Sequence, residues 1–485
     1  MKRHLALLLL LPLGGLAQTI AITSGAVDHQ VFQRDAGNRA TLKLAGTAQG
    51  AEGKPVDARV VAKKGGSGWK AIGKADGGAW SGELTLAQGG PYRIEVRTAG
   101  GAPAAVDDVL VGDLWVLAGQ SNMQGVGVLE DVQEPNSLVH SFDMTDHWDI
   151  AREPLHRLVD AADRVHWPVN PKTHEPEKVE GEALKKAIES RKKGAGLGLP
   201  FAVEMLRRTG VPVGLLPCAH GGTSMDQWDP ALKSKGGDSL YGATLRRVNV
   251  AGGKVKGILW YQGESDANPK AAPEFLAKFE RLVAAFRQDF GQPDLPFYYV
   301  QIGRHVSTAS VAEWNSVQQS QLLAESRIAK SGLVVSVDSA LDDGIHVSTA
   351  DQKRLGKRLA NLACHDLFPN VAACAGLKRG PRPQSAVFAG AGIIRVGFSG
   401  VNGGLQSEGR LWGFSLHDAG GAYIPAIYKA IVDPQDPSAV LLYYGGKLPE
   451  GAALHYGAGK DPYCNLTDAA GMGAPVFGPM PVALK

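Results

Sequence analysis

The chain contains the sequence Leu114-Trp115-Val116-Leu117-Ala118-Gly119-Gln120-Ser121-Asn122-Met123. Its first half, 114–118, is a continuous apolar run that predicts a buried strand of a parallel sheet. A serine just past such a strand stands at the edge of the sheet, where a substrate can reach it. A helix that begins there would offer free N–H groups to a developing oxyanion. Met123 takes the place of the second glycine of the Gly-x-Ser-x-Gly elbow, which disfavours an ordinary α/β-hydrolase.

Outward from this stretch, the segment 109–370 alternates apolar runs with amphipathic helical stretches. We expect strands at 114–118, 211–217, 257–261, 296–302 and 332–337. We expect helices at 200–209, 243–250, 274–290, 311–330 and 350–367. A capping box of Thr349 and Gln352 would open the last helix. This alternation predicts an α/β fold, a flavodoxin-like parallel sheet in three layers with a site outside the carboxyl ends of its strands.

Two β regions and one insertion surround or interrupt this segment. Residues 18–108 and 375–485 consist of short alternating runs between Gly-rich turns, which predicts β-sandwich-like regions. For the first region, 18–108, two roles stay open: support or spacing, or the binding of sugar. Residues 124–194 form a long polar insertion that ends in a charged helix at 180–193 and contains His147, Trp148, His166, Trp167 and His174. Two interpretations of the insertion stay open: it shapes a substrate cleft, or it is a solvated excursion.

Composition and the N-terminus restrict the function. The chain has 485 residues, 44% of them hydrophobic, and a formal net charge of +3. It is therefore a folded protein, and neither nucleic acid nor an anionic membrane is an expected partner. Residues 1–17 have the basic start, apolar core and small-residue end of a secretory signal, and no later run is long enough to span a bilayer. We expect an exported protein, periplasmic or extracellular.

Four cysteines remain after residue 17: Cys218, Cys364, Cys374 and Cys464. Sequence alone leaves their pairing open. A Cys364–Cys374 bridge is preferred because it would close a short loop after a helix, whereas Cys218 follows a buried strand and is expected to be a packed thiol. No metal-binding sequence pattern occurs, so no metal or other cofactor is expected. The oligomeric state stays open.

Four polar stretches follow predicted strands: 119–123, 220–224, 260–265 and 343–346. The carboxyl ends of parallel strands lie along one edge of a sheet. We therefore expect these stretches to meet there and to form one site.

The residue types in these stretches suit ester cleavage. Ser121 is the candidate nucleophile, and a serine hydroxyl needs a neighbouring base to take its proton. His346 is the candidate base. Asp343, three residues earlier, can reach Nδ1 of the imidazole and hold it in the required tautomer. His220 and His305 also follow strands, but neither has an acid three residues before it.

Three candidate donors would stabilise the oxyanion: the N–H of Ser121, the N–H of Gly222 and the side-chain amide of Gln262. Substrate contacts are expected from a further set of polar and aromatic residues: Gln120, Asn122, Trp228, Glu264 and Arg304. Trp228 would offer a flat face to a sugar ring. Glu264 would orient its neighbours in the cleft or pair with Arg304.

These four blocks, with Val111-Gly112-Asp113-Leu114-Trp115 and Tyr463-Cys464-Asn465-Leu466, resemble the sialate O-acetylesterase family of the SGNH-hydrolase superfamily. The resemblance extends over nearly the whole chain after residue 17. It implies a Ser121–His346–Asp343 triad that removes acetyl groups from a glycan. It also implies that Gln262 fills the oxyanion role that an asparagine plays in other SGNH enzymes. The insertion at 124–194 departs from the simpler members of the family.

The sequence thus predicts a secreted serine esterase that removes O-acetyl groups from carbohydrate and is similar to sialate O-acetylesterases. One alternative is an acetyl esterase acting on a plant or algal polysaccharide such as xylan or xyloglucan. Another is a non-catalytic carbohydrate-binding protein. A lipase or general esterase is disfavoured because the sequence contains no apolar lid segment.

Overall fold

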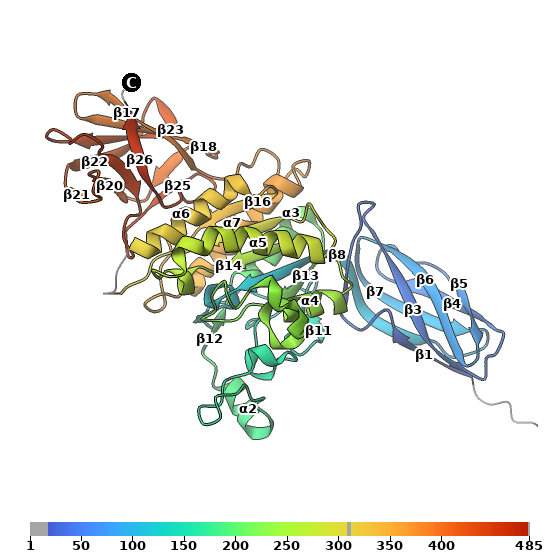
Figure 1. Cartoon of the computed structure of the whole chain (residues 1–485). Helices are drawn as coiled ribbons and strands as arrows, with labels where there is room; N and C mark the ends of the chain where they lie inside the picture. The colour runs from blue at the N-terminus through green and yellow to red at the C-terminus, as the bar shows by residue number, and fades with distance from the viewer. Residues whose placement is uncertain (1–17, 308–311, 484–485) are drawn as a thin grey trace, which may run out of the picture. The chain divides into compact units, whose positions relative to one another are not determined.

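The computed structural model describes residues 18–307 and 312–483. The chain divides into two compact units, of which one comprises Met1–Gln30 and Arg34–Val111, and the other Val31–Gln33 and Gly112–Lys485 (Figure 1). The expected signal segment 1–17 lies outside the described residues. None of the helices in the described ranges is long and apolar enough to cross a membrane.

The first unit is an antiparallel β structure. Its strands follow in the order β1 (Thr19–Ser24), β3 (Arg39–Gln49), β6 (Ala79–Ala87), β5 (Lys70–Asp76), β4 (Pro55–Val61), β7 (Gly89–Thr98) and the first part of β8 (Ala104–Gly119). Along β3 every second residue is buried, Ala40, Leu42 and Leu44 among them. This period of two is what a strand shows when only one of its faces covers a core.

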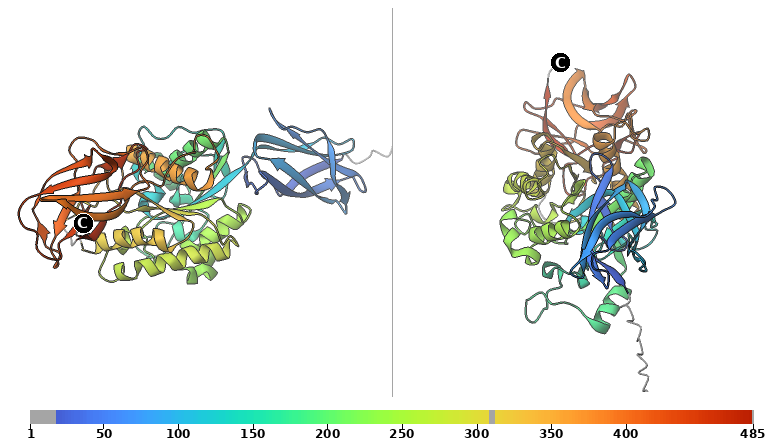
Figure 2. Two further views of the ribbon diagram at one scale, coloured as in Figure 1. Left: turned by 90° about the horizontal axis from the view of Figure 1, so that it is seen from above. Right: turned by 90° about the vertical axis from the view of Figure 1, so that its right-hand side faces the viewer.

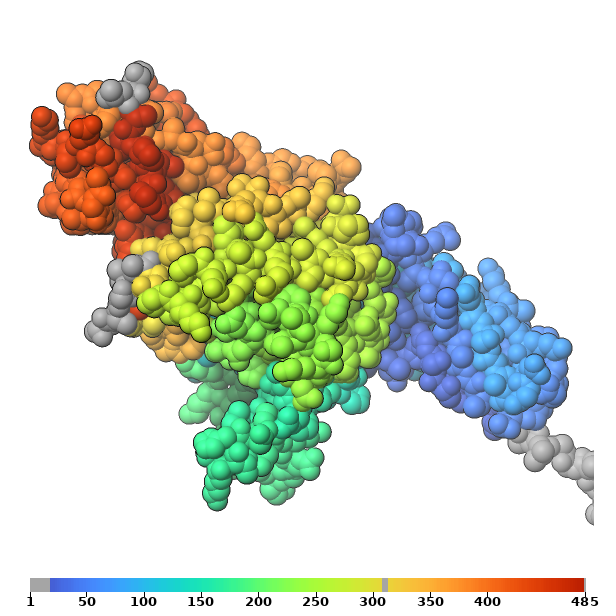
Figure 3. Space-filling model, in the orientation of Figure 1, coloured from blue at the N-terminus to red at the C-terminus, as the bar shows by residue number. Residues whose placement is uncertain are grey.

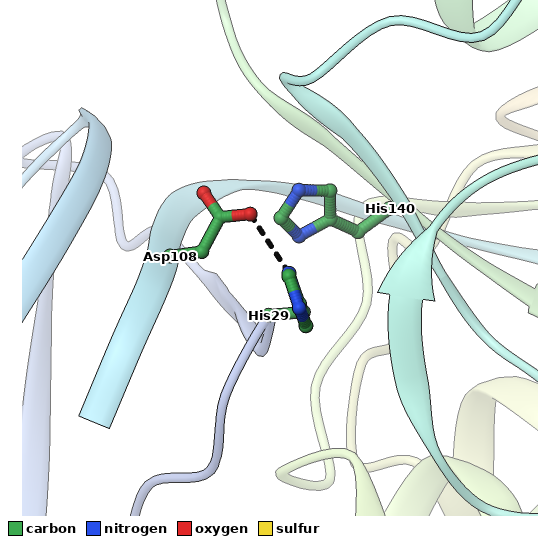
Figure 4. A group of neighbouring side chains, drawn as sticks. All are labelled: His29, Asp108 and His140. Atoms are coloured by element: carbon green, nitrogen blue, oxygen red, sulfur yellow. Dashed lines mark hydrogen bonds and ion pairs between the residues drawn. The ribbon is translucent and has the colours of Figure 1, made fainter.

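A turn of the first unit is fixed by contacts between two distant segments. Nδ1 of His29 lies 2.7 Å from Oδ2 of Asp108 (Figure 4). The His29 N–H donates to the carbonyl of Asp107 at 3.0 Å. These bonds join the segment after β1 to the middle of β8.

The second unit is built on a parallel sheet. Its strands follow in the order β10 (Val139–Phe142), β13 (Val213–Pro217), β8, β14 (Gly257–Tyr261), β15 (Phe297–Gln301) and β16 (Ser331–Val335), with β11 (Trp148–Ile150) antiparallel to β10 and β2 (Val31–Gln33) paired with β8. The five predicted strands are confirmed. Numbered along the chain, they run 2-1-3-4-5 across the sheet, the flavodoxin-like order. Each residue of β13, β14, β15 and β16 is buried, which explains their continuous apolar sequences.

Helices cover both faces of this sheet (Figure 2). Helices α3 (Gly198–Thr209) and α7 (Thr349–Leu367) pack together on one face, and α4 (Leu240–Val250), α5 (Phe275–Asp289) and α6 (Ala312–Arg327) lie on the other. The predicted capping box of α7 is wrong by one residue. Ser348 is the N-cap and accepts the N–H of Asp351 at 3.4 Å, because the Thr349 hydroxyl donates to the carbonyl of Val128.

The insertion 124–194 adds to the sheet as well as projecting from it. It contains β9 (Gly127–Val128), β10, β11, the short 3₁₀ helices η1 (Leu158–Asp160) and η2 (Arg164–His166), α2 (Gly181–Glu189) and β12 (Lys193–Ala195). Strands β9 and β12 pair antiparallel and close its base. Its projecting part is the teal-green lobe of Figure 3. The sequence did not predict β10, because His140 and Ser141 interrupt its apolar character.

The C-terminal strands pack on the α/β core within the same unit. They follow in the order β21 (Tyr423–Ile424), β20 (Phe414–His417), β24 (Ala453–Tyr456), β26 (Phe477–Ala483), β17 (Arg382–Gly390), β18 (Ile393–Ser399), β23 (Asp436–Tyr444) and β22 (Ile427–Asp433), beside a pair of β19 (Leu405–Ser407) and β25 (Leu466–Asp468). Gln301 of β15 is bonded through its side chain to both backbone groups of Val476, at 2.8 and 3.0 Å. The preferred Cys364–Cys374 disulfide is present at the end of α7.

Candidate active site

Ser121 stands where the chain leaves β8 and begins the short helix α1 (Ser121–Gln124). Gly119 has a φ of +132°, and a Cβ there would lie 2.2 Å from the carbonyl oxygen of Tyr261, so glycine is required for this close approach. The Gln120 N–H donates to that same carbonyl at 2.8 Å. Ser121 is therefore fixed between the ends of β8 and β14, where the strand order reverses and sites of this fold form.

The Asp343–His346 pair is formed as predicted from its spacing. Nδ1 of His346 lies 3.0 and 2.9 Å from the two carboxylate oxygens of Asp343. Lys193 also donates to Asp343, at 2.6 Å. Burial alone would raise the pKa of the Asp343 carboxyl, but the hydrogen bonds from Lys193, His346 and two backbone N–H groups hold that pKa far below its ordinary value. Asp343 therefore stays ionised and can stabilise an imidazolium.

Asn122 connects the serine to the histidine loop. Its Oδ1 accepts the N–H of Val347 at 3.0 Å, and its Nδ2 donates to the carbonyl of Ile345 at 3.4 Å. The residue after Ser121 is thus bonded to the backbone on both sides of His346. No hydrogen bond joins Ser121 to His346 in the described part of the chain, and catalytic bonds of this kind often tighten only when substrate binds.

Glu264 places a buried carboxylate beside this junction. Its Oε1 accepts from Nδ2 of Asn122 at 2.8 Å, while its Oε2 is buried without a partner among the described residues. Burial raises the pKa of this carboxyl, against the opposing effects of Asn122 and His346. The expected pairing with Arg304 is wrong, because Arg304 binds Asp461 at 3.0 Å.

Two backbone N–H groups are available to an oxyanion. Within the described residues, neither the N–H of Ser121 nor that of Gly222 donates a hydrogen bond. Gly222 has a φ of +71° and open space where a Cβ would point. The preceding Gly221 donates its N–H to Oε1 of Gln124 at 2.8 Å, and a Cβ on Gly221 would lie 3.4 Å from the Cβ of Ser121. The 220–223 loop is therefore held against the serine.

Gln262 does not have the free N–H that its expected oxyanion role requires. Its Nε2 donates to the carbonyl of Thr223 at 3.1 Å and to Oδ2 of Asp266 at 2.5 Å, which uses both amide hydrogens. Its side chain is fully buried. The amide instead fixes the loop that carries Gly222.

Four expected substrate contacts are likewise engaged elsewhere in the protein. Trp228 is 0% exposed and donates its indole N–H to the Thr223 hydroxyl, so its ring cannot stack on a sugar. The buried Gln120 side chain accepts two N–H groups of the loop after β14. Arg304 lines a separate cavity of about 190 Å³ beside Tyr463. The buried Asn122 positions the histidine loop.

Sequence reasoning missed Lys193 and Gln124. Both lie at the ends of the insertion, where β9 and β12 pair. Lys193 is a cation in a polar stretch, and nothing local in the sequence indicates that its partner is Asp343, 150 residues away. For Gln124, the available signal was its position directly after the 119–123 stretch.

Ser121 thus stands at the switch point of a parallel sheet covered by helices on both faces, and the residue after it is bonded to the loop that carries the Asp343–His346 pair. This arrangement suits ester hydrolysis by a serine. Residues 111–365 match the family model described as "Carbohydrate esterase, sialic acid-specific acetylesterase". The chain belongs to this family. It is a carbohydrate acetylesterase, a carboxylic ester hydrolase.

Two relatives illustrate the similarity. An Arabidopsis thaliana protein described as a probable carbohydrate esterase is 28% identical over 273 residues, which cover 51% of this chain and 88% of that protein. The crystal structure of a carbohydrate acetylesterase from Xanthomonas citri has the same fold, with a TM-score of 0.64 and 23% identity over 95% of this chain and 99% of that one.

Proposed function

We propose that the protein is an exported serine acetylesterase that removes O-acetyl groups from a glycan through Ser121, His346 and Asp343. His346 takes the hydroxyl proton as Oγ of Ser121 attacks the ester carbonyl. The N–H groups of Ser121 and Gly222 stabilise the resulting oxyanion. The sugar oxygen leaves with the proton from His346, and water then attacks the acetyl-serine in the same way to release acetate.

One observation carries this assignment: Asn122, directly after Ser121, is bonded to the backbone on both sides of His346. Residues 225 positions apart are thereby held as neighbours. The Asp343 carboxylate at Nδ1 leaves Nε2 of the imidazole for the serine, which gives the order nucleophile, base, orienting acid.

Export and domain organisation are part of the proposal. The basic and apolar pattern of residues 1–17 supports a secretory signal, and the Cys364–Cys374 disulfide supports an oxidising compartment. We assign residues 18–108 to an N-terminal β domain, 109–370 to the esterase domain and 375–485 to a C-terminal β region.

The test is acetate release from O-acetylated sialic acid, xylan and xyloglucan. Ser121→Ala should abolish turnover while the protein stays folded, and adding His346→Ala should lower the rate little further because the two groups act as a unit. Substantial turnover by folded Ser121→Ala contradicts the assignment. Acetate released from none of the three glycans contradicts the substrate class.

A further inference from the structure

A cavity of about 590 Å³ lies between the insertion and the segment 232–240. We call it the insertion cavity. Its lining is mainly apolar and includes Leu158, Val165, Trp167, Leu232 and Leu240. This volume falls within the range of ligand pockets, roughly 300–1,000 Å³, and far exceeds what an acetyl group needs.

The insertion cavity lies beside the 220–223 loop. His220 and Thr223, at the two ends of the 220–223 loop, both line it. Between them, Gly221 approaches the Cβ of Ser121. One part of this short loop therefore lies against the nucleophile while its two ends line the cavity, so the loop links the cavity to the position of Ser121.

Trp167 gives the cavity an aromatic wall with a fixed position. It is half-buried, and its indole N–H donates to the carbonyl of Ala161 at 2.7 Å. An anchored ring offers its apolar face with little loss of conformational entropy on binding. This is the role that sequence analysis gave to Trp228, which is buried.

Two histidines, His166 and His220, add polar groups to the lining of the cavity. Nδ1 of His220 lies 3.2 Å from Nδ1 of His166, and the two rings stack. Burial lowers the pKa of both imidazoles, and for His166 the neighbouring His220 adds to this effect. The lining also contains two charged residues of opposite sign, Lys235 and Asp238, so it carries no net charge from them. Apolar walls with a few neutral hydrogen-bonding groups match a sugar, which has an apolar ring face and a rim of hydroxyl groups.

We infer that the insertion cavity is the subsite for the sugar ring that bears the acetyl group, with Trp167 as its stacking platform. This inference rests on the proposed function, because the sugar is the alcohol released from the ester at Ser121. It gives the insertion a role in selecting the alcohol of the substrate.

The experiment compares a sugar acetate with ethyl acetate, whose alcohol is too small to fill the cavity. The sugar acetate is the one of mono-O-acetylated xylose, glucose and N-acetylneuraminic acid that the wild type hydrolyses fastest. Trp167→Ala should raise KM for the sugar acetate roughly tenfold and leave ethyl acetate turnover unchanged. Trp167→Phe should restore most of the affinity. Trp412→Ala, which removes an exposed tryptophan just before β20, should leave KM for both esters unchanged.

Two further variants keep the test independent of folding and of catalysis. Leu232→Trp fills the cavity and should raise KM for the sugar acetate alone, which decides the matter if Trp167→Ala does not fold. Calorimetry with Ser121→Ala should detect binding of the sugar acetate, and Ser121→Ala/Trp167→Ala should bind it roughly tenfold more weakly. Equal effects of Trp167→Ala on both esters, or none on either, overturn the inference, whereas an active Ser121→Ala overturns the proposed function instead.

Discussion

Replacing Asn122 by alanine tests whether this side chain positions His346 in addition to stabilising the fold. The Asn122 side chain is 1% exposed and makes three hydrogen bonds, to Glu264, Ile345 and Val347. Asn122→Ala removes the partner of the buried Val347 N–H, of a buried carboxylate oxygen of Glu264 and of the half-buried Ile345 carbonyl. An unpaired buried group costs about 1–3 kcal/mol, and partial relaxation of the loop reduces the sum, so we expect the free energy of unfolding to fall by roughly 2–4 kcal/mol.

The catalytic effect follows from the same bonds. Without Asn122, the backbone on both sides of His346 is no longer fixed to the residue after Ser121. A displacement of a catalytic group by about 1 Å can lower the rate about 10²-fold. We therefore expect kcat for p-nitrophenyl acetate to fall roughly 10²-fold, with stability measured in parallel by urea denaturation.

Asn402→Ala is the matched control. Asn402 is 9% exposed and bonds to Lys378 and Asp468 in the C-terminal region. This variant should lose a similar amount of stability and keep its kcat. If Asn122→Ala loses stability and retains the wild-type kcat, Asn122 does not position the histidine and the reasoning is refuted.

Three other substitutions test the electrostatics of the site. Asp343→Asn should lower kcat by roughly 10³–10⁴ by favouring the wrong imidazole tautomer; a folded variant with near-normal kcat would remove Asp343 from the triad. Glu264→Gln should be more stable than wild type at neutral pH, because burial raises the pKa of Glu264 and penalises its charge. This advantage should shrink as pH falls through the pKa of Glu264 in the folded protein, and it should vanish only well below about pH 4, where the carboxyl is protonated in the unfolded state as well. A difference in Tm that does not change with pH would contradict this. The depressed pKa of Asp343 stabilises the fold above about pH 4, and this stability is lost as pH falls. Lys193→Ala removes one cause of the depressed pKa, so the fall in Tm between neutral and acid pH should be smaller than in the wild type. Lys192→Ala should leave that fall in Tm unchanged.

The sequence by itself determined the sheet and the chemistry within short segments. Strands β13 to β16 are buried at each position, so their apolar runs had to appear as continuous stretches whatever surrounded them. The Asp343–His346 bond likewise needs only a loop of three residues, because a carboxylate at that spacing can reach Nδ1. Strand ends of a parallel sheet share one edge, which brought Ser121 and this loop together in the prediction.

The tertiary structure alone decided which polar side chains remain free for substrate. Gln262 and Trp228 have the chemistry for an oxyanion donor and a sugar platform, but Asp266 and Thr223 occupy their N–H groups. Lys193 became part of the site only because the pairing of β9 with β12 delivers it to Asp343. A buried donor must find a partner within hydrogen-bonding distance, and the partners that satisfy it come from segments whose proximity is set by packing and not by their order in the chain.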